Sequence, residues 1–148
     1  MGLDQYAYVA TKAGQRNEWY DGCAFNETTK DFENPKMDKP REIAYWRKHP
    51  NLQGWMESLW KRKLHEANKN EPDDEGWGSS FNGVEVELTW EDLDQLESDV
   101  KNGRLPATTG FFFGNNSDDY YKEYDLKFIR DAKAELLCGL KVFYDSSW

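Results

Sequence analysis

The sequence lacks most of the features by which common protein classes are recognised. It has only two cysteines, Cys23 and Cys138, with no CxxC spacing, so it predicts neither a zinc site nor a disulfide framework. It also has no internal repeat, no heptad pattern and no glycine-rich nucleotide loop. Its 148 residues are too few for a two-domain enzyme, and we expect one domain spanning residues 1–148.

Long apolar runs and positive charge are scarce as well. No apolar run approaches the ~20 residues that a membrane span needs, and the first residues show no signal-peptide pattern. We therefore expect a cytoplasmic protein with no membrane partner. Asp and Glu total 28 against 19 Lys and Arg, a net charge of −9, which disfavours direct binding to nucleic acid.

Aliphatic residues are few, and aromatic residues take their place. Leu, Ile, Val and Phe together number 27 of 148, a share that by itself would suggest disorder. Seven Trp, eight Tyr and eight Phe offset this shortage, because each large ring buries roughly 150–250 Å². The composition predicts a folded protein with an aromatic core.

Hydrophobic spacing predicts an α+β fold with about five short strands and three helices packed on one face. The first strand, over residues 5–11, would place Tyr6, Tyr8 and Ala10 on one face. Thr89 and Asp92 resemble a capping box, and Pro50 suits the first position of a helix. The other strands are expected at 43–46, 84–88, 105–114 and 141–144, the helices at 50–64, 90–102 and 118–138, and the long loops at about 12–40 and 66–82.

Several blocks of the sequence resemble a family of small uncharacterised proteins of bacteriophages and some bacteria. The blocks are the start Met1-Gly2-Leu3-Asp4 with Tyr6, the Tyr45-Trp46-Arg47-Lys48 block, the segment from Leu105-Pro106 to Gly114, and the Ser147-Trp148 ending. Members of this family often carry the label phosphoglycerate kinase, which the length of this chain argues against. The resemblance implies a phage setting, hence a host-cell cytoplasm, and no established activity.

The best candidate ligand site precedes the predicted helix at Pro50. Free backbone amides and the positive end of the helix dipole favour an anion there, such as a phosphate or carboxylate. Basic residues would bind the anion, and aromatic and amide side chains would hold a planar ligand. The alternative is that the basic residues pair with the chain's own carboxylates and that the rings form core. The candidate residues are Tyr45, Trp46, Arg47, Lys48, His49, Asn51 and Gln53.

A second candidate is the acidic outer face of the helix at 90–102. Glu91, Asp94 and Glu97 could dock on a basic host protein, although a solvated helix face explains the same pattern. We expect Trp148 to pack on the domain rather than to fray, and to be a second partner contact if it does not contribute to stability.

No catalytic motif, metal site or cofactor is predicted. His49 and His65 have no Ser or Cys at triad spacing, and acidic residues at 118–119 suit a first helical turn. Two functional hypotheses follow. The first is a phage accessory protein that binds, and in some cases inhibits, a host macromolecule through an acidic, aromatic-rich surface. The alternative is a pocket protein, either a small enzyme or a nucleotide-sequestering protein, that binds a phosphate-bearing ligand at Arg47, Lys48 and Pro50.

Overall fold

The computed structural model of the chain describes residues 2–12, 15–68, 81, 83–106 and 118–148. These residues form an α+β domain, as the sequence predicts. The main elements are β1 (Asp4–Ala10), β4 (Arg41–Arg47), α2 (Pro50–Glu66), β5 (Val86–Leu88), α3 (Trp90–Lys101), α4 (Asp118–Leu137) and β6 (Lys141–Ser147), and between β1 and β4 lie α1 (Gln15–Asp21), β2 (Ala24–Asn26) and β3 (Asp31–Glu33).

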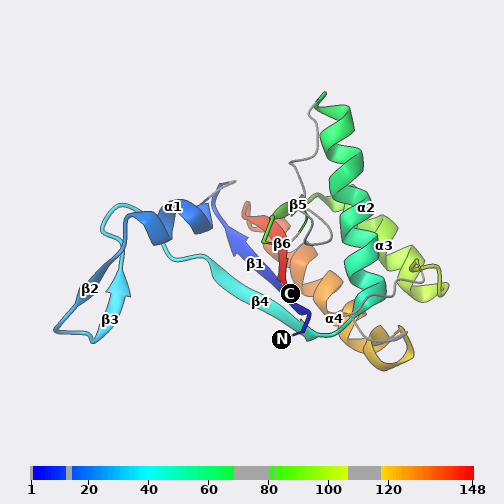
Figure 1. Cartoon of the computed structure of the whole chain (residues 1–148), viewed down its shortest axis with the longest axis horizontal. Helices are drawn as coiled ribbons and strands as arrows, with labels where there is room; N and C mark the ends of the chain where they lie inside the picture. The colour runs from blue at the N-terminus through cyan, green and yellow to red at the C-terminus, as the bar shows by residue number, and fades with distance from the viewer. Residues whose placement is uncertain (1, 13–14, 69–80, 82, 107–117) are drawn as a thin grey trace.

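The main sheet is antiparallel and has the strand order β4-β1-β6-β5. The first and last strands are neighbours, with Asp4 opposite Ser147 and Ala10 opposite Lys141. The two chain ends therefore lie close together at the centre of the molecule (Figure 1). The pairing of β1 with β4 shifts register between Ala7, which lies opposite Ala44, and Tyr8, which lies opposite Glu42.

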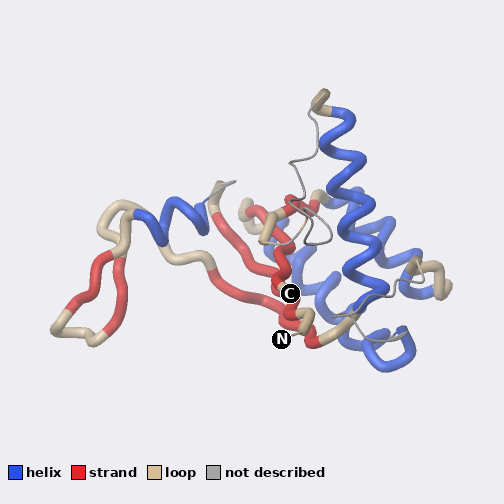
Figure 2. The backbone as a smooth tube through the Cα atoms, viewed as in Figure 1, coloured by secondary structure: helices blue, strands red, loops and turns tan. Residues whose placement is uncertain are grey.

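The helices α2, α3 and α4 cover one face of this sheet (Figure 2). Buried residues from both layers form the main core, and large rings make up much of it, as the composition predicts. Trp46 lies at the centre, with its ring 5.0 Å from Phe128 and 6.2 Å from Tyr144. Other core residues are Ala7, Leu52, Met56, Phe81, Leu88, Leu93, Leu96 and Ile129.

The predicted helix signals are present in the structure. Thr89 and Asp92 form a complete capping box at the start of α3, and Gly103 follows that helix in the left-handed conformation. Pro50 occupies the start of α2, where its missing amide leaves no bond unmade. Local sequence therefore determines where both helices begin.

Two tyrosines of α4 protect the free edge of β4. The backbone amide of Tyr45 donates to the Tyr124 hydroxyl (2.9 Å), and the amide of Arg47 donates to the Tyr121 hydroxyl (3.2 Å). An unpaired strand edge is a template for pairing with another chain. These hydroxyls occupy amides that would otherwise be open to such pairing.

The prediction of a loop over residues 12–40 is wrong in part. The segment contains α1 and the small antiparallel sheet β2-β3, which projects away from the main domain (Figure 1). Its strands have three residues each and, in the described part of the chain, pair only with each other, so they lack the alternation that marks a half-buried strand. Most of the predicted strand at 105–114 and most of the predicted loop at 66–82 lie outside the described residues.

Candidate functional site

The candidate ligand residues before and within α2 do not share one surface. Strand β4 turns Trp46 into the core and Tyr45 and Arg47 to the opposite face, because successive side chains of a strand alternate. Three more of the candidates, His49, Asn51 and Gln53, are buried. Lys48 is exposed and has positive φ. The sequence run is thus divided between the core and the surface.

The buried members belong to a hydrogen-bonded network inside the domain. Trp46 Nε1 donates to Asp125 Oδ1 (2.8 Å), and His49 Nε2 lies 2.7 Å from Asp125 Oδ2. The Gln5 side chain bonds both backbone groups of His49: the His49 amide donates to Gln5 Oε1 (2.8 Å), and Gln5 Nε2 donates to the His49 carbonyl (3.0 Å). These bonds connect β1, the start of α2, and α4.

The network continues to β6. Gln5 Nε2 also donates to the Tyr144 hydroxyl (2.8 Å), which in turn donates to Gln53 Oε1. Burial raises the pKa of Tyr144 well above its ordinary value. All three side chains are buried, so their bonds hold the helix layer on the sheet and offer no surface to a ligand.

Arg47 is near the chain ends, where it pairs with a carboxylate. Its Nη1 lies 2.9 Å from Asp4 Oδ1, which also accepts a bond from the Tyr45 hydroxyl (2.5 Å). These bonds, first Tyr45 and then Arg47, lower the pKa of Asp4 despite partial burial. Arg47 and Trp148 line one small hollow of about 320 Å³. Trp148 packs against the main core, which confirms that it is docked.

The acidic residues of α3 are largely matched by lysines. Asp94 lies 2.5 Å from Lys133 Nζ, and Glu97 lies 3.1 Å from Lys101 Nζ and 3.5 Å from Lys133 Nζ. The bond from Lys101, followed by the charge of Lys133, lowers the pKa of Glu97. Glu91 is exposed. This face carries less net negative charge than its sequence indicates.

The sheet face opposite the helices carries aromatic side chains. The rings of Tyr6 and Tyr45 lie 5.3 Å apart, and Tyr8 stacks on Phe143 with centroids 5.5 Å apart and planes at 20°. The shared face of Tyr6, Tyr8 and Ala10 was predicted from their spacing in β1, but without a functional role. Residues from the neighbouring strands extend it across the sheet.

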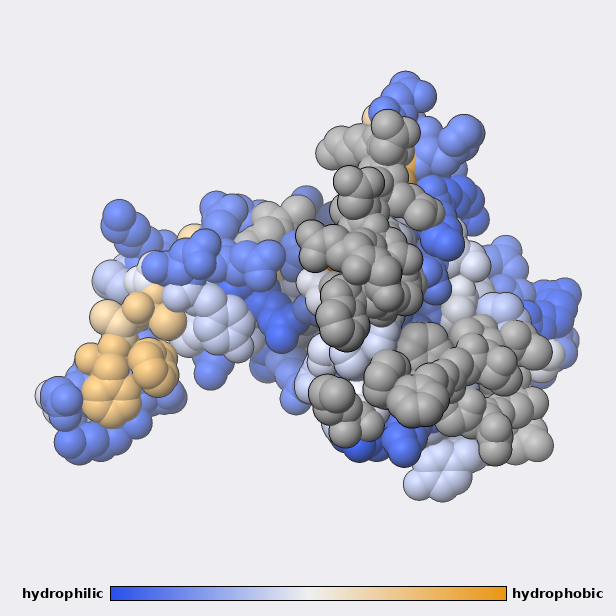
Figure 3. Space-filling model, viewed as in Figure 1, coloured by the Kyte–Doolittle hydropathy of each residue, from blue (hydrophilic) through white to orange (hydrophobic). Residues whose placement is uncertain are grey.

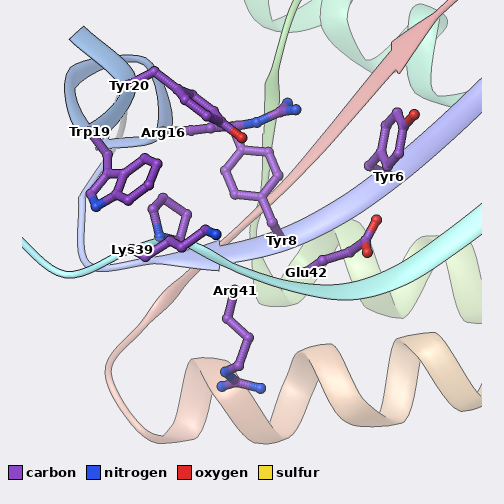
Figure 4. Close-up of a pocket in the computed structure, with 9 residues that line it drawn as sticks. Tyr6, Tyr8, Arg16, Trp19, Tyr20, Lys39, Arg41 and Glu42 are labelled. Carbon is purple, nitrogen blue, oxygen red and sulfur yellow. The ribbon is translucent and has the colours of Figure 1, made fainter. Parts of the chain in front are cut away.

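A hollow of about 550 Å³ lies where this face meets α1 (Figure 4). Tyr8 lies in the middle of the view, with Trp19 and Tyr20 of α1 on one side and Tyr6 on the other. The volume is within the range of small-molecule sites. Its lining residues are Tyr6, Tyr8, Arg16, Trp19, Tyr20, Lys39, Pro40, Arg41 and Glu42.

The two polar side chains at the base of this hollow, Arg16 and Tyr8, each bind a carboxylate. The Arg16 guanidinium lies 5.0 Å above the Tyr8 ring and forms an ion pair with Asp145. The Tyr8 hydroxyl donates to Glu85, and burial together with this bond raises the pKa of Tyr8. Burial also raises the pKa of Asp145, although Arg16 opposes this shift. The floor is thus a fixed, internally paired cluster.

Residues 15–40, which we call the arm, begin at the rim of this hollow. Trp19 is only 3% exposed, and its carbonyl accepts a bond from Asn34 Nδ2 (3.2 Å), which ties the two sides of the arm together. A Cβ added at Gly22 would lie 2.7 Å from Asn34 Nδ2, so a larger residue there would displace the Asn34 side chain. The arm therefore has a defined shape at its base.

The far end of the arm exposes two phenylalanines. Phe25 on β2 and Phe32 on β3 are 47% and 54% exposed, and their rings lie 5.4 Å apart. Figure 3 shows hydrophobic residues gathered on this part of the surface, while the rest of the described surface in that view is mostly hydrophilic. The pair lines a second hollow of about 550 Å³ that shares Trp19 and Lys39 with the first.

The chain matches no family model, no curated protein and no solved structure in the three comparisons. Among the described residues, no helix has the length and hydropathy that a bilayer crossing requires. Within the same part of the chain, no three His, Cys, Asp or Glu side chains are grouped so that they could hold a metal ion.

Proposed function

We propose that the protein is a binding protein that docks on a partner protein through the tip of its arm. The observation that carries this proposal is the exposed pair Phe25 and Phe32 on a two-stranded sheet whose strands, among the described residues, pair only with each other. An isolated two-stranded hairpin is at best marginally stable in water. The two half-exposed rings contact each other across the strands, and their exposed surface could anchor an interface.

The charge of the tip indicates the chemistry of the partner. Glu27, Asp31 and Glu33 flank the phenylalanines in the sequence, and the one basic residue between Ala24 and Glu33 is Lys30, which forms an exposed ion pair with Glu27 (3.1 Å). Asp31 and Glu33 form no ion pair among the described residues. This is an acidic, aromatic-rich surface of the kind that the sequence hypothesis requires. The matching surface is an apolar pocket bordered by Lys or Arg, since complementary charge guides association and excludes wrong partners.

The family resemblance would place this partner in a bacterial host, with inhibition of the partner as one consequence of docking. Glu91, Asp94, Glu97 and Trp148 remain candidates for a secondary contact. The acidic residues of α3 are the weaker choice, because the ion pairs of Asp94 and Glu97 with lysines reduce the charge available to a partner.

The experiment compares capture from a bacterial lysate by three forms of the tagged protein. They are the wild type, the Phe25→Ser/Phe32→Ser variant, and a Tyr120→Ser control, which removes an 83% exposed ring from α4. We expect one protein to bind wild type and control in stoichiometric amounts and to be lost from the arm variant. Binding of that purified protein should weaken as salt rises, because the contact is partly electrostatic.

Two outcomes would overturn the proposal. One is capture that all three forms share, which would place the contact elsewhere on the surface. The other is a concentration-dependent dimer, seen by light scattering and abolished in the Phe25→Ser/Phe32→Ser variant. That dimer would make a second copy of this chain the occupant of the arm.

A further inference from the structure

The hollow in Figure 4 is a candidate binding site separate from the arm tip, because neither Phe25 nor Phe32 lines it. Its walls are mainly aromatic, from Tyr6, Tyr8, Trp19 and Tyr20. Tyr8 and Trp19 are only 4% and 3% exposed and form its base, whereas Tyr20 is exposed and Tyr6 is half-buried. These two accessible rings favour a flat ligand, since aromatic surfaces stack on one another at centroid distances of about 4.5–7 Å. A cavity of about 550 Å³ would hold a ligand with one or two rings.

The charges that line the hollow are not equivalent. Arg16 is paired with Asp145, and Arg41 Nη2 lies 2.8 Å from Glu135. Lys39, in contrast, has its Nζ 5.2 Å above the Trp19 ring, and no carboxylate of the described residues lies within ion-pair distance of it. Among the described residues that line this hollow, Lys39 is thus the cation that is available to an anionic ligand.

Glu42 is the matching anion. It lies across from Tyr8 in the pairing of β1 with β4, and Figure 4 shows its carboxylate on the Tyr6 side, away from Trp19 and Lys39. In the described part of the chain no cation forms an ion pair with it. One end of the hollow therefore offers a positive charge, the other a hydrogen-bond acceptor, and aromatic rings lie between them.

We propose that this hollow binds a planar nitrogen heterocycle that carries an anionic group, such as a nucleoside monophosphate. Lys39 binds the phosphate, the aromatic walls stack on the base, and Glu42 accepts hydrogen bonds from N–H groups at the base edge. Guanine suits Glu42 better than adenine, because it presents two adjacent N–H donors to the two carboxylate oxygens. This site is separate from the Arg47 and Lys48 site that the sequence indicated, and it requires no protein partner.

The test is calorimetric titration of the full-length protein with GMP, AMP, guanosine and ribose 5-phosphate. We expect GMP to bind more tightly than either of its parts and than AMP. Lys39→Ala should weaken GMP by about tenfold or more and leave guanosine unchanged, since a hydrogen bond to a charged group is lost. Glu42→Gln should weaken GMP and guanosine but not ribose 5-phosphate.

Two controls separate this site from a general charge effect and from the arm tip. Lys36→Ala removes an exposed lysine of the arm that does not line the hollow, and it should leave GMP binding unchanged. The Phe25→Ser/Phe32→Ser variant should also bind GMP normally, whatever its effect on a protein partner. Unchanged melting temperatures would show that the variants fold.

Three results would overturn the proposal. The first is no heat from GMP at millimolar concentration. The second is an equal loss in Lys36→Ala and Lys39→Ala, which would indicate nonspecific attraction. The third is ribose 5-phosphate binding as tightly as GMP, which would show that the aromatic walls take no part.

Discussion

His49 Nε2 lies 2.7 Å from Asp125 Oδ2, and both side chains are buried. The pair joins the residue before α2 to the middle of α4, 76 positions later in the chain. Asp125 accepts a second bond, from Trp46 Nε1, with its other oxygen. One carboxylate thus serves two ring donors that come from β4 and from the link to α2.

Replacing this carboxylate should destabilise the fold. Asp125→Leu removes the acceptor of both rings, and a buried polar group left without its partner costs about 1–3 kcal/mol. We expect the free energy of unfolding to fall by about 2–5 kcal/mol in urea titrations. Asp125→Asn, which keeps one acceptor, should lose less. Equal stability of wild type and Asp125→Leu would show that the network contributes nothing.

The tyrosines that protect the β4 edge give a second prediction. Tyr121→Phe combined with Tyr124→Phe keeps both rings but removes the hydroxyls that accept from the Arg47 and Tyr45 amides. Stability should drop by about 1–3 kcal/mol, and the exposed edge should promote self-association. Light scattering and urea titration measure the two effects. The exposed Tyr120→Phe should change neither, and a monomeric double variant with normal stability would refute this role.

Asp92 gives a prediction about pH. Burial alone would raise its pKa, but bonds from Lys63 and from Thr89 outweigh burial and lower the pKa. A lowered folded-state pKa stabilises the fold above the ordinary carboxyl pKa of about 4, and this contribution is lost as the pH falls through the folded value. Asp92→Asn should therefore cost about 1–2 kcal/mol at pH 7 and progressively less below pH 4.

Urea titrations of Asp92→Asn and wild type at several pH values measure this difference. The exposed Asp21→Asn serves as the matched control and should differ from wild type by less than about 0.5 kcal/mol. A difference between Asp92→Asn and wild type that stays constant from pH 7 to pH 3 would contradict the role assigned to the charge.

Local signals made the main domain predictable, and distant contacts made the rest unpredictable. The capping box of Thr89 and Asp92 needs only four consecutive residues. The apolar spacing of α2 likewise lies within one continuous stretch of sequence. The sequence indicates Trp46 and His49 as ligand contacts, because nothing near them in the chain identifies the distant Asp125 as their common acceptor. The alternation along β4 was the available signal that Trp46 points inward and Tyr45 outward.

The arm was missed for a different reason. Phe25 and Phe32 lie on three-residue strands that bury neither face against a core, so no hydrophobic period marks them. Only their cross-strand pairing shows that they form one exposed pair. The surface that we propose as functional is therefore the part with the weakest sequence signal.

Trp148 gives a prediction about stability at the chain end. Its ring packs on the core beside β6, and removing it exposes apolar area worth about 2 kcal/mol. Deleting Trp148 should lower the melting temperature by about 4–8 °C in a calorimetric scan. An unchanged melting curve together with lost partner binding would instead make Trp148 a contact residue for the partner.

Site-specific photo-cross-linking tests the central claim most directly. A benzophenone amino acid replaces Phe32 in one form of the protein and Tyr120 in another, and both are irradiated in bacterial cells. We predict one covalent adduct with a single protein at position 32, through a segment bordered by Lys or Arg, and none at position 120. Adducts at position 120 alone, or adducts at both positions with the same set of proteins, would contradict the proposal that the arm tip is the docking surface.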